Sequence, residues 1–221
     1  MTELTDVKPG TIVGPYSICR GFRSQGGQAR VFEAEIREKY REPGMPRRIA
    51  LKFAKEEYQD ALLIEAEFLQ RFDHANIVKL LPLPGFRSRD VYTSRADLPP
   101  LGSGWYYAME FLDGGGLEYY LTRTTRITGM FSNNAPHQQR PLSVLVAVGI
   151  ARQIASALTH IHQKQVVNLD VKPANILFRI RKLKAFRGSV PQAVLGDFGI
   201  SRDLRYPRAS LSGMATREYV S

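Results

Sequence analysis

The chain has 221 residues, of which 43% are hydrophobic and 24% are charged, so it can bury a core and form one or two domains. Its net charge of +10 favours acidic partners such as nucleotides, and a soluble basic enzyme explains that charge better than a nucleic-acid binder. The single cysteine, Cys19, excludes an internal disulfide and fits a reducing compartment. The polar N-terminus has no signal core, and the longest apolar run, Val144 to Ala151, is too short to span a bilayer. We therefore expect a cytoplasmic protein, with neither membrane nor nucleic acid among its partners.

The first segments predict a β-hairpin with a glycine-containing turn. Tyr16 to Arg20 and Val31 to Ile36 alternate as strands do, and Gly26 and Gly27 lie in the turn between them. Such a turn can lay backbone N–H groups over phosphates, because the absent Cβ permits close approach. On these residues alone, an ordinary hairpin turn explains the pattern better.

A lysine in an apolar strand comes next. Residues 37–48 are charged and predict an exposed loop, and Ile49 to Phe53 predicts a buried strand that carries Lys52. Burying an ammonium group is costly without a partner. A helix follows, because apolar residues recur at helical spacing at Ala61, Ile64, Phe68 and Phe72. Glu65 lies beside this stripe, so we predict a Lys52–Glu65 ion pair. The alternative for Glu65 is a solvated carboxylate, which is the interpretation for Glu67.

The middle of the chain predicts a long loop, a strand and two helices. Leu80 to Pro100 has four prolines and predicts a loop, whereas Trp105 to Leu112 is aromatic-rich and predicts a strand that stops at the glycines 114–116. Leu117 to Leu121 begins a short helix. Ser143 is a plausible N-cap for a long amphipathic helix reaching about Gln163.

Chemistry-bearing residues gather in the last third. The run VVNLDVKPANILF, Val166 to Phe178, places Asp170, Lys172 and Asn175 in a loop between two apolar strands. Such a loop can hold polar side chains still, as catalysis requires. Ala193 to Leu195 predicts a short buried strand, and Gly-Asp-Phe-Gly follows it with Asp197.

Taken in order, these segments resemble the catalytic domain of eukaryotic-type Ser/Thr protein kinases. The matching parts are the glycine-rich turn, the strand lysine, the helix glutamate, D-x-K-P-x-N, D-F-G and A-T-R-E-Y near the end of the chain. The resemblance implies an α+β, bilobal protein-kinase-like fold: a five-stranded antiparallel N-lobe sheet plus one helix, and an incomplete helical C-lobe. It implies a kinase domain over residues 10–221, with an N-lobe at about 10–110, a hinge at about 110–116 and a partial C-lobe at about 117–221.

The resemblance also implies a function and a site. ATP–Mg²⁺ would bind between the lobes, and the γ-phosphate would pass to a Ser or Thr hydroxyl of a protein substrate. Asp170 would accept the hydroxyl proton, and Lys172 would contact the γ-phosphate. Lys52, oriented by Glu65, and the glycine-rich turn would hold the phosphates, and Asn175 and Asp197 would bind magnesium. The nucleotide-binding set would be Ser24, Gln25, Gly26, Gly27, Gln28, Ala29, Val31, Ala50, Lys52, Met109, Glu110, Leu112 and Leu177.

Three departures keep a second function open. Ser24 and Ala29 replace two of the three family glycines, Asn168-Leu169 replaces the usual His-Arg before Asp170, and the resemblance stops before the family's A-P-E motif. The alternative is a nucleotide-binding pseudokinase or scaffold that regulates a partner. With either function, the resemblance implies an incomplete C-lobe: the chain is a fragment of a longer protein, or a partner or a second copy covers that lobe. Ser201, Ser210, Ser212 and Thr216 are hydroxyl candidates for phosphorylation.

Overall fold

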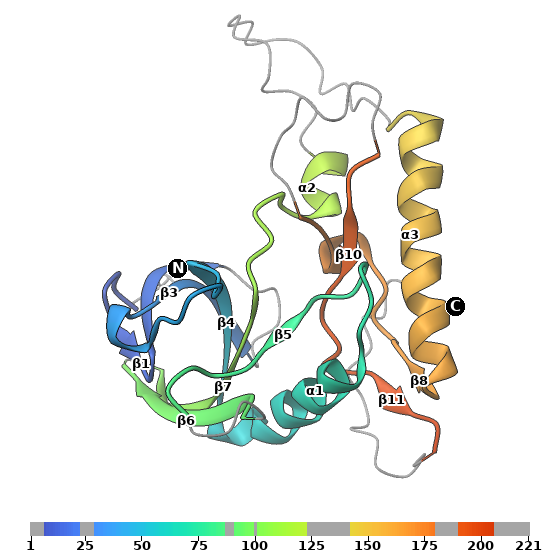
Figure 1. Cartoon of the computed structure of the whole chain (residues 1–221). Coiled ribbons are helices and arrows are strands. Elements are labelled where there is room, and N and C mark those ends of the chain that lie inside the picture. The colour runs from blue at the N-terminus through green and yellow to red at the C-terminus, as the bar shows by residue number, and fades with distance from the viewer. Residues whose placement is uncertain are drawn as a thin grey trace, which may run out of the picture. The chain divides into compact units, whose positions relative to one another are not determined.

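The computed structural model describes residues 7–22, 29–86, 91–99, 101–122, 142–179 and 190–205. The chain divides into two compact units. Unit 1 comprises Met1–Asp73 and Val78–Phe111, and unit 2 comprises His74–Ile77 and Leu112–Ser221. Unit 1 is built on one large sheet, whereas unit 2 combines the helices α2 and α3 with short two-stranded sheets (Figure 1).

The sheet of unit 1 is antiparallel throughout and has seven strands in the described part of the chain. Its strands are β1 (Ile12–Val13), β2 (Tyr16–Phe22), β3 (Ala29–Ile36), β4 (Arg48–Lys55), β5 (Leu80–Leu81), β6 (Thr93–Leu98) and β7 (Gly102–Glu110). The order is β1-β2-β3-β4-β7-β5, and β6 also pairs with β7. The predicted α+β class is confirmed.

The predicted count of five strands is wrong, as is the loop predicted over residues 80–100. Ile12–Val13 folds back on β2 and adds one strand. β5 and β6 pair with successive parts of β7, from Leu80 opposite Met109 to Leu98 opposite Gly102. One edge of the sheet is thus an interrupted strand. Its exposed side chains are polar, so the prolines and charges around it masked the strand signal.

One face of this sheet makes the core, and the other carries the residues predicted to bind nucleotide. Phe32, Ala34, Leu51 and Phe53 belong to the buried apolar cluster, together with Tyr106. Because side chains alternate along a strand, the residues between them, including Val31 and Lys52, lie on the opposite face. Burial raises the pKa of Tyr106, so its phenol stays neutral in this core.

Helix α1 (Gln59–Arg71) follows the 3₁₀ turn η2 (Glu56–Tyr58) and packs against β4 and β7. A further 3₁₀ turn, η1 (Glu38–Tyr40), lies between β3 and β4. The buried face of α1 is shifted by one residue from the predicted stripe and comprises Leu62, Glu65, Ala66, Phe68 and Leu69. Glu65 therefore faces inward, and Glu67 is exposed, both as predicted.

Unit 2 contains α2 (Leu117–Thr122), α3 (Val144–Gln163), β8 (Val166–Val167), η3 (Pro173–Asn175), β9 (Ile176–Phe178), β10 (Ala193–Leu195) and β11 (Arg202–Asp203). β9 pairs with β10, and β11 pairs with β8, both antiparallel. Ser143 caps α3 as predicted, because its hydroxyl accepts a hydrogen bond from the Val146 N–H. α3 lies beside β10 in Figure 1 and contacts both β8 and β10.

Among the described residues, α3 is the one helix long and apolar enough to cross a membrane by length and composition. A buried core helix of a soluble protein meets the same criterion. Ile150, Ile154 and Ile161 of α3 are buried within unit 2. The uninterrupted apolar run of α3 ends at Ala151, so the length of that run alone does not single out this helix.

Candidate active site

A buried ion pair joins β4 to α1 in unit 1. The Lys52 Nζ lies 2.8 Å from Oε1 and 2.6 Å from Oε2 of Glu65. The side chains are only 12% and 3% exposed, so each charge depends on the other for compensation. The predicted Lys52–Glu65 pair is therefore present. It follows from the apolar stripe of α1, which turns Glu65 towards the sheet.

Four of the residues predicted at the nucleotide site share one face of the sheet. Ala50 is directly opposite Met109, and Lys52 is directly opposite Val31. Residues two apart on a strand lie on the same side, so these four side chains form a continuous patch. Glu110 ends β7, and its N–H donates to the Lys79 carbonyl at 2.9 Å. Because the Glu110 N–H is bonded to Lys79, the predicted purine-binding group of Glu110 is its carbonyl.

The remaining predicted nucleotide residues are distributed differently. Ser24, Gln25, Gly26, Gly27 and Gln28 lie outside the described residues. Ala29 is the first residue of β3. Leu112 and Leu177 belong to unit 2, where Gly116 forms a β-bridge with Leu177.

The loop between β8 and β9 brings Asp170, Lys172 and Asn175 into contact. The Asp170 Oδ2 lies 2.8 Å from the Lys172 Nζ and accepts a hydrogen bond of 2.9 Å from the Asn175 Nδ2. The same Nδ2 also donates to the Asp170 carbonyl at 2.9 Å. Asn175 is 9% exposed and ends η3, so its orientation is fixed by burial and by both bonds. These contacts hold the Asp170 carboxylate at a defined position.

Asp197 lies at the same end of the β9–β10 pair as Asn175. Leu195 pairs with Ile176, and the Gly196 N–H donates to the Asn175 carbonyl at 2.8 Å. Asn175 immediately precedes β9, and Asp197 follows Gly196. Both side chains therefore start from the same end of the β9–β10 pair. Amide and carboxylate oxygens are the ligands that Mg²⁺ prefers, and Mg²⁺ usually takes few of them from protein. The donor types therefore fit this ion. No cluster of three or more His, Cys, Asp or Glu residues exists in the described ranges.

Asn168, which stands where the family has a histidine, contacts both Asp170 and Asp197. Its Nδ2 donates to the Asp197 carbonyl at 3.1 Å, and its Oδ1 accepts the Asp170 N–H at 2.8 Å. Asn168 thus bridges the two predicted catalytic segments. The second bond is an Asx-turn contact, which an asparagine two residues before Asp170 could have suggested.

Of residues 200–221, which contain the hydroxyl candidates for phosphorylation, the structure describes those up to Arg205. Ser210, Ser212 and Thr216 lie outside the described residues. Ser201 is described, and its hydroxyl oxygen is buried and has no hydrogen-bond partner among the described residues. In this conformation Ser201 is therefore not accessible to a phosphate donor.

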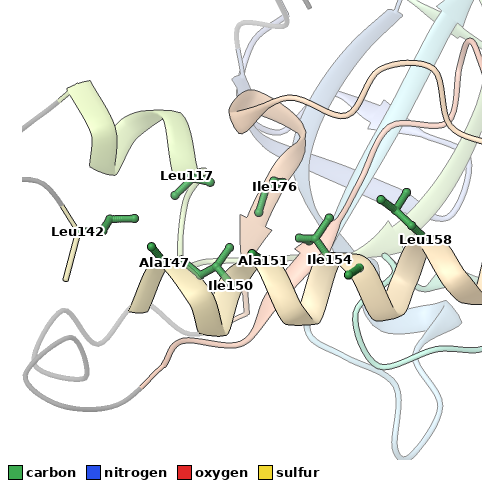
Figure 2. Close-up of a pocket in the computed structure, with 9 residues that line it drawn as sticks. Leu117, Leu142, Ala147, Ile150, Ala151, Ile154, Leu158 and Ile176 are labelled. Atoms are coloured by element: carbon green, nitrogen blue, oxygen red, sulfur yellow. The ribbon is translucent and has the colours of Figure 1, made fainter. Parts of the chain in front are cut away.

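A separate apolar groove runs along α3 in unit 2 (Figure 2). Its volume is about 390 Å³. It is lined by Leu117, Leu142, Ala147, Ile150, Ala151, Ile154, Ala155, Leu158 and Ile176. Among the described residues, none that lines the groove carries a polar side chain, so these residues offer no side-chain ligand for a phosphate or a metal ion.

Known protein kinases match this chain over most of its length. The family model for the protein kinase domain matches residues 25–221. The serine/threonine-protein kinase PknD of Mycobacterium tuberculosis is 28% identical over 218 residues, which is 98% of this chain and 27% of PknD. PrkC of Bacillus subtilis, also a serine/threonine-protein kinase, is 30% identical over 176 residues, which is 75% of this chain and 21% of PrkC.

A further relative, the serine/threonine-protein kinase PknJ of Mycobacterium bovis, is 29% identical over 205 residues, covering 90% of this chain and 28% of PknJ. The chain matches between about a fifth and just over a quarter of the length of these three relatives. The family match includes the loop of Asp170, Lys172 and Asn175 and the Asp197 segment. This chain therefore belongs to the protein kinase family.

Proposed function

We propose that this chain transfers the γ-phosphate of ATP to Ser or Thr hydroxyls of a protein substrate, with Mg²⁺. The observation that carries the proposal is the set of contacts around Asp170. One oxygen of its carboxylate, Oδ2, contacts both the Lys172 Nζ and the Asn175 Nδ2. In the transfer, the substrate oxygen bonds to the γ-phosphorus and the bond to the β–γ bridging oxygen breaks, releasing ADP. The hydroxyl proton passes to Asp170.

Each residue contributes positioning or charge. Asp170 orients the attacking hydroxyl, and Lys172 offsets charge that develops on the transferred group. Lys52, held by Glu65, contacts the nucleotide phosphates. The glycine-containing turn, residues 24–29, contributes backbone N–H groups to the same phosphates.

The adenine would be held by apolar side chains and by backbone. Val31 and Ala50 would contact one face of the purine, and Leu177 the other. Met109 would be the gatekeeper. The Glu110 carbonyl and the backbone of Leu112 would hydrogen-bond the purine edge.

Asn175 and Asp197 would hold Mg²⁺ through their side-chain oxygens. When bound, the ion neutralises phosphate charge. Asn175 donates its amide N–H to Asp170, so the amide group is already oriented. Asp197 has a carboxylate oxygen anchored by the Gly199 N–H at 3.2 Å.

We also propose the extent and setting of the domain. The kinase domain would run from residue 10 to 221, with lobes at about 10–110 and 117–221 joined by a hinge at about 110–116. The single Cys19 supports a cytoplasmic location. The partners would be the protein substrate and either a second copy or another protein on unit 2.

The decisive variant is Asp170→Ala. Transfer of label from ATP to a generic basic protein should fall by about 10²–10⁴-fold, because the acceptor of the hydroxyl proton is removed. Nucleotide affinity, measured by titration with ADP–Mg²⁺, should stay within about twofold.

The control is Asp73→Ala, which removes an exposed carboxylate of unit 1 and should leave transfer unchanged. An Asp170→Ala protein that transfers label at the wild-type rate would show that Asp170 is not the base. A wild-type chain that binds no ATP–Mg²⁺ would overturn the whole proposal.

A second candidate function is regulation of a partner by a nucleotide-binding pseudokinase. The apolar groove along α3 favours it, because exposed apolar surface of this kind marks interaction sites. The complete set of Lys52, Asp170, Asn175 and Asp197 favours the enzyme, since a scaffold has no physical need of them. If the wild-type protein bound ATP–Mg²⁺ but transferred no label, this result would support the pseudokinase function.

A further inference from the structure

A carboxylate is buried in the sheet of unit 1 at a position that the proposed chemistry does not use. Glu33, in the middle of β3, is 6% exposed. Its Oε2 accepts from the Arg20 Nε at 2.6 Å, and its Oε1 accepts from the Arg48 Nη1 at 2.9 Å. We call these three residues the Arg20–Glu33–Arg48 cluster. It joins three neighbouring strands, β2, β3 and β4.

The cluster lies on the nucleotide-facing side of the sheet. Glu33 pairs with Ala50 across β3 and β4, and it is two residues from Val31. The core lies on the other face, beneath Phe32 and Ala34. Hydrophobic packing of the core therefore does not explain the buried carboxylate. A buried charge persists only where its partners compensate the lost hydration, which the two guanidinium groups do here.

Arg48 connects the cluster to the end of β7. Its guanidinium carbon lies 4.7 Å from the centroid of the Phe111 ring, within the range of a cation–π contact. Phe111 is the last residue of unit 1, directly after Glu110 and before Leu112. Because Glu33 fixes one edge of the guanidinium, Arg48 is held over the ring although its side chain is 43% exposed.

We propose that the Arg20–Glu33–Arg48 cluster is a positioning device for nucleotide binding, which acts through Phe111. Clamping the Phe111 ring restricts the backbone between Glu110 and Leu112, the two residues assigned to the purine edge. The inference rests on the proposed function, since it requires that ATP is bound there. The proposal gives Glu33 and Arg48 a role in the affinity for the nucleotide. Neither residue contacts the nucleotide or takes part in the transfer step.

Two single variants and their combination test the clamp. Arg48→Met keeps the apolar stem and removes the guanidinium, and Phe111→Leu keeps an apolar side chain and removes the ring. Each should raise the Kd for ADP–Mg²⁺ and the KM for ATP about fivefold, with kcat within about twofold. The double variant should be no weaker than either single variant, because both remove the same contact.

A control ion pair is available elsewhere in unit 1. Glu56 of η2 pairs with Arg95 of β6 at 2.8 Å, and these side chains are 60% and 49% exposed. Glu56→Gln removes an ion pair that shares no residue with the cluster and should leave Kd and KM unchanged. Glu33→Gln, which keeps the shape of the side chain but weakens its hold on Arg48, should raise Kd in the same direction as Arg48→Met.

A merely structural role would give a different pattern. It would lower the thermal midpoint of the nucleotide-free protein while leaving Kd and KM at wild-type values, and this outcome overturns the proposal. Additive effects of Arg48→Met and Phe111→Leu on Kd overturn it as well. In both cases the wild type still binds ATP–Mg²⁺, so the proposed function stands. A wild type that binds no nucleotide overturns both.

Discussion

Asp197 is held in a backbone conformation that few residues other than glycine adopt. Its φ is +56°, in the left-handed region, which aspartate tolerates better than most residues. Asn168 donates to its carbonyl, and the Gly199 N–H donates to its carboxylate. Such conformations persist when surrounding contacts over-determine them. Asn168, which stands where the family has a histidine, therefore links Asp170 to Asp197.

The link predicts the behaviour of Asn168 variants. Asn168→Ala removes both hydrogen bonds, and we expect kcat to fall by about 10- to 100-fold, because a small misplacement of catalytic groups is costly. Asn168→Asp keeps the oxygen that accepts from the Asp170 N–H, but it places a carboxylate oxygen opposite the Asp197 carbonyl, where Asn168 has a donor. The kcat of Asn168→Asp should therefore fall at least as far as that of Asn168→Ala.

Steady-state kinetics with varied Mg²⁺ is the measurement, and both variants should require more Mg²⁺ for half-maximal rate. Leu169→Ala, in the adjacent and 39% exposed position, serves as the control. If Asn168→Ala showed wild-type kcat and Mg²⁺ dependence, the bridge would have no catalytic consequence.

Helix α3 is joined to β10 by the side chain of Gln153. Its Oε1 accepts from the Ala193 N–H at 2.9 Å and from the Asn76 Nδ2 at 2.9 Å. Its Nε2 donates to the Pro191 carbonyl at 2.8 Å. Through Asn76, the short segment His74–Ile77 becomes part of unit 2. One amide side chain thus connects three segments that are far apart in the sequence.

Replacement of Gln153 should therefore destabilise unit 2. Gln153→Leu leaves the N–H of fully buried Ala193 without this acceptor, which costs about 1–3 kcal/mol. We expect the thermal midpoint to fall by several degrees. Gln163→Leu, at the exposed end of α3, is the matched control and should unfold like the wild type. Equal midpoints for the two variants would show that Gln153 contributes little.

The two units differ in how completely they bury their apolar residues. The sheet of unit 1 encloses a cluster that includes Tyr16, Leu51 and Phe53. In unit 2, Val144, Leu145 and Val148 of α3 are 79%, 64% and 60% exposed. These three residues lie on the helix that also lines the apolar groove (Figure 2). Exposed apolar surface of this kind promotes association.

We expect the 221-residue chain to bind a hydrophobic dye and to self-associate with rising concentration. Leu145→Lys combined with Val148→Lys should reduce both dye fluorescence and the mass measured by light scattering, because the exposed apolar area is removed. His162→Lys with Gln163→Lys adds the same charge at the exposed end of α3 and is the control. A monodisperse wild type that melts cooperatively and binds no dye would contradict the expectation.

Local patterns in the sequence were sufficient for much of the fold. The alternation of residues 31–36 predicted β3, the helical spacing after residue 60 predicted α1, and Ser143 predicted the start of α3. These signals arise between residues close in the chain, where periodicity directly reflects backbone geometry. The inward turn of Glu65 towards Lys52 followed from the same reasoning, because a buried ammonium group requires a counter-charge.

Other features depended on which distant segments meet. The interrupted edge of β5 and β6, the bridge from Asn168 to Asp197, and the contact of Arg48 with Phe111 all join residues whose spacing along the chain carries no signal. Glu33 resembles an ordinary solvent-facing strand residue until the register of β2, β3 and β4 places two arginines around it. The sequence therefore predicted which residues would carry phosphate chemistry. Cross-strand register and loop packing decided which neighbours hold them in place, since those contacts exist only once the chain is folded.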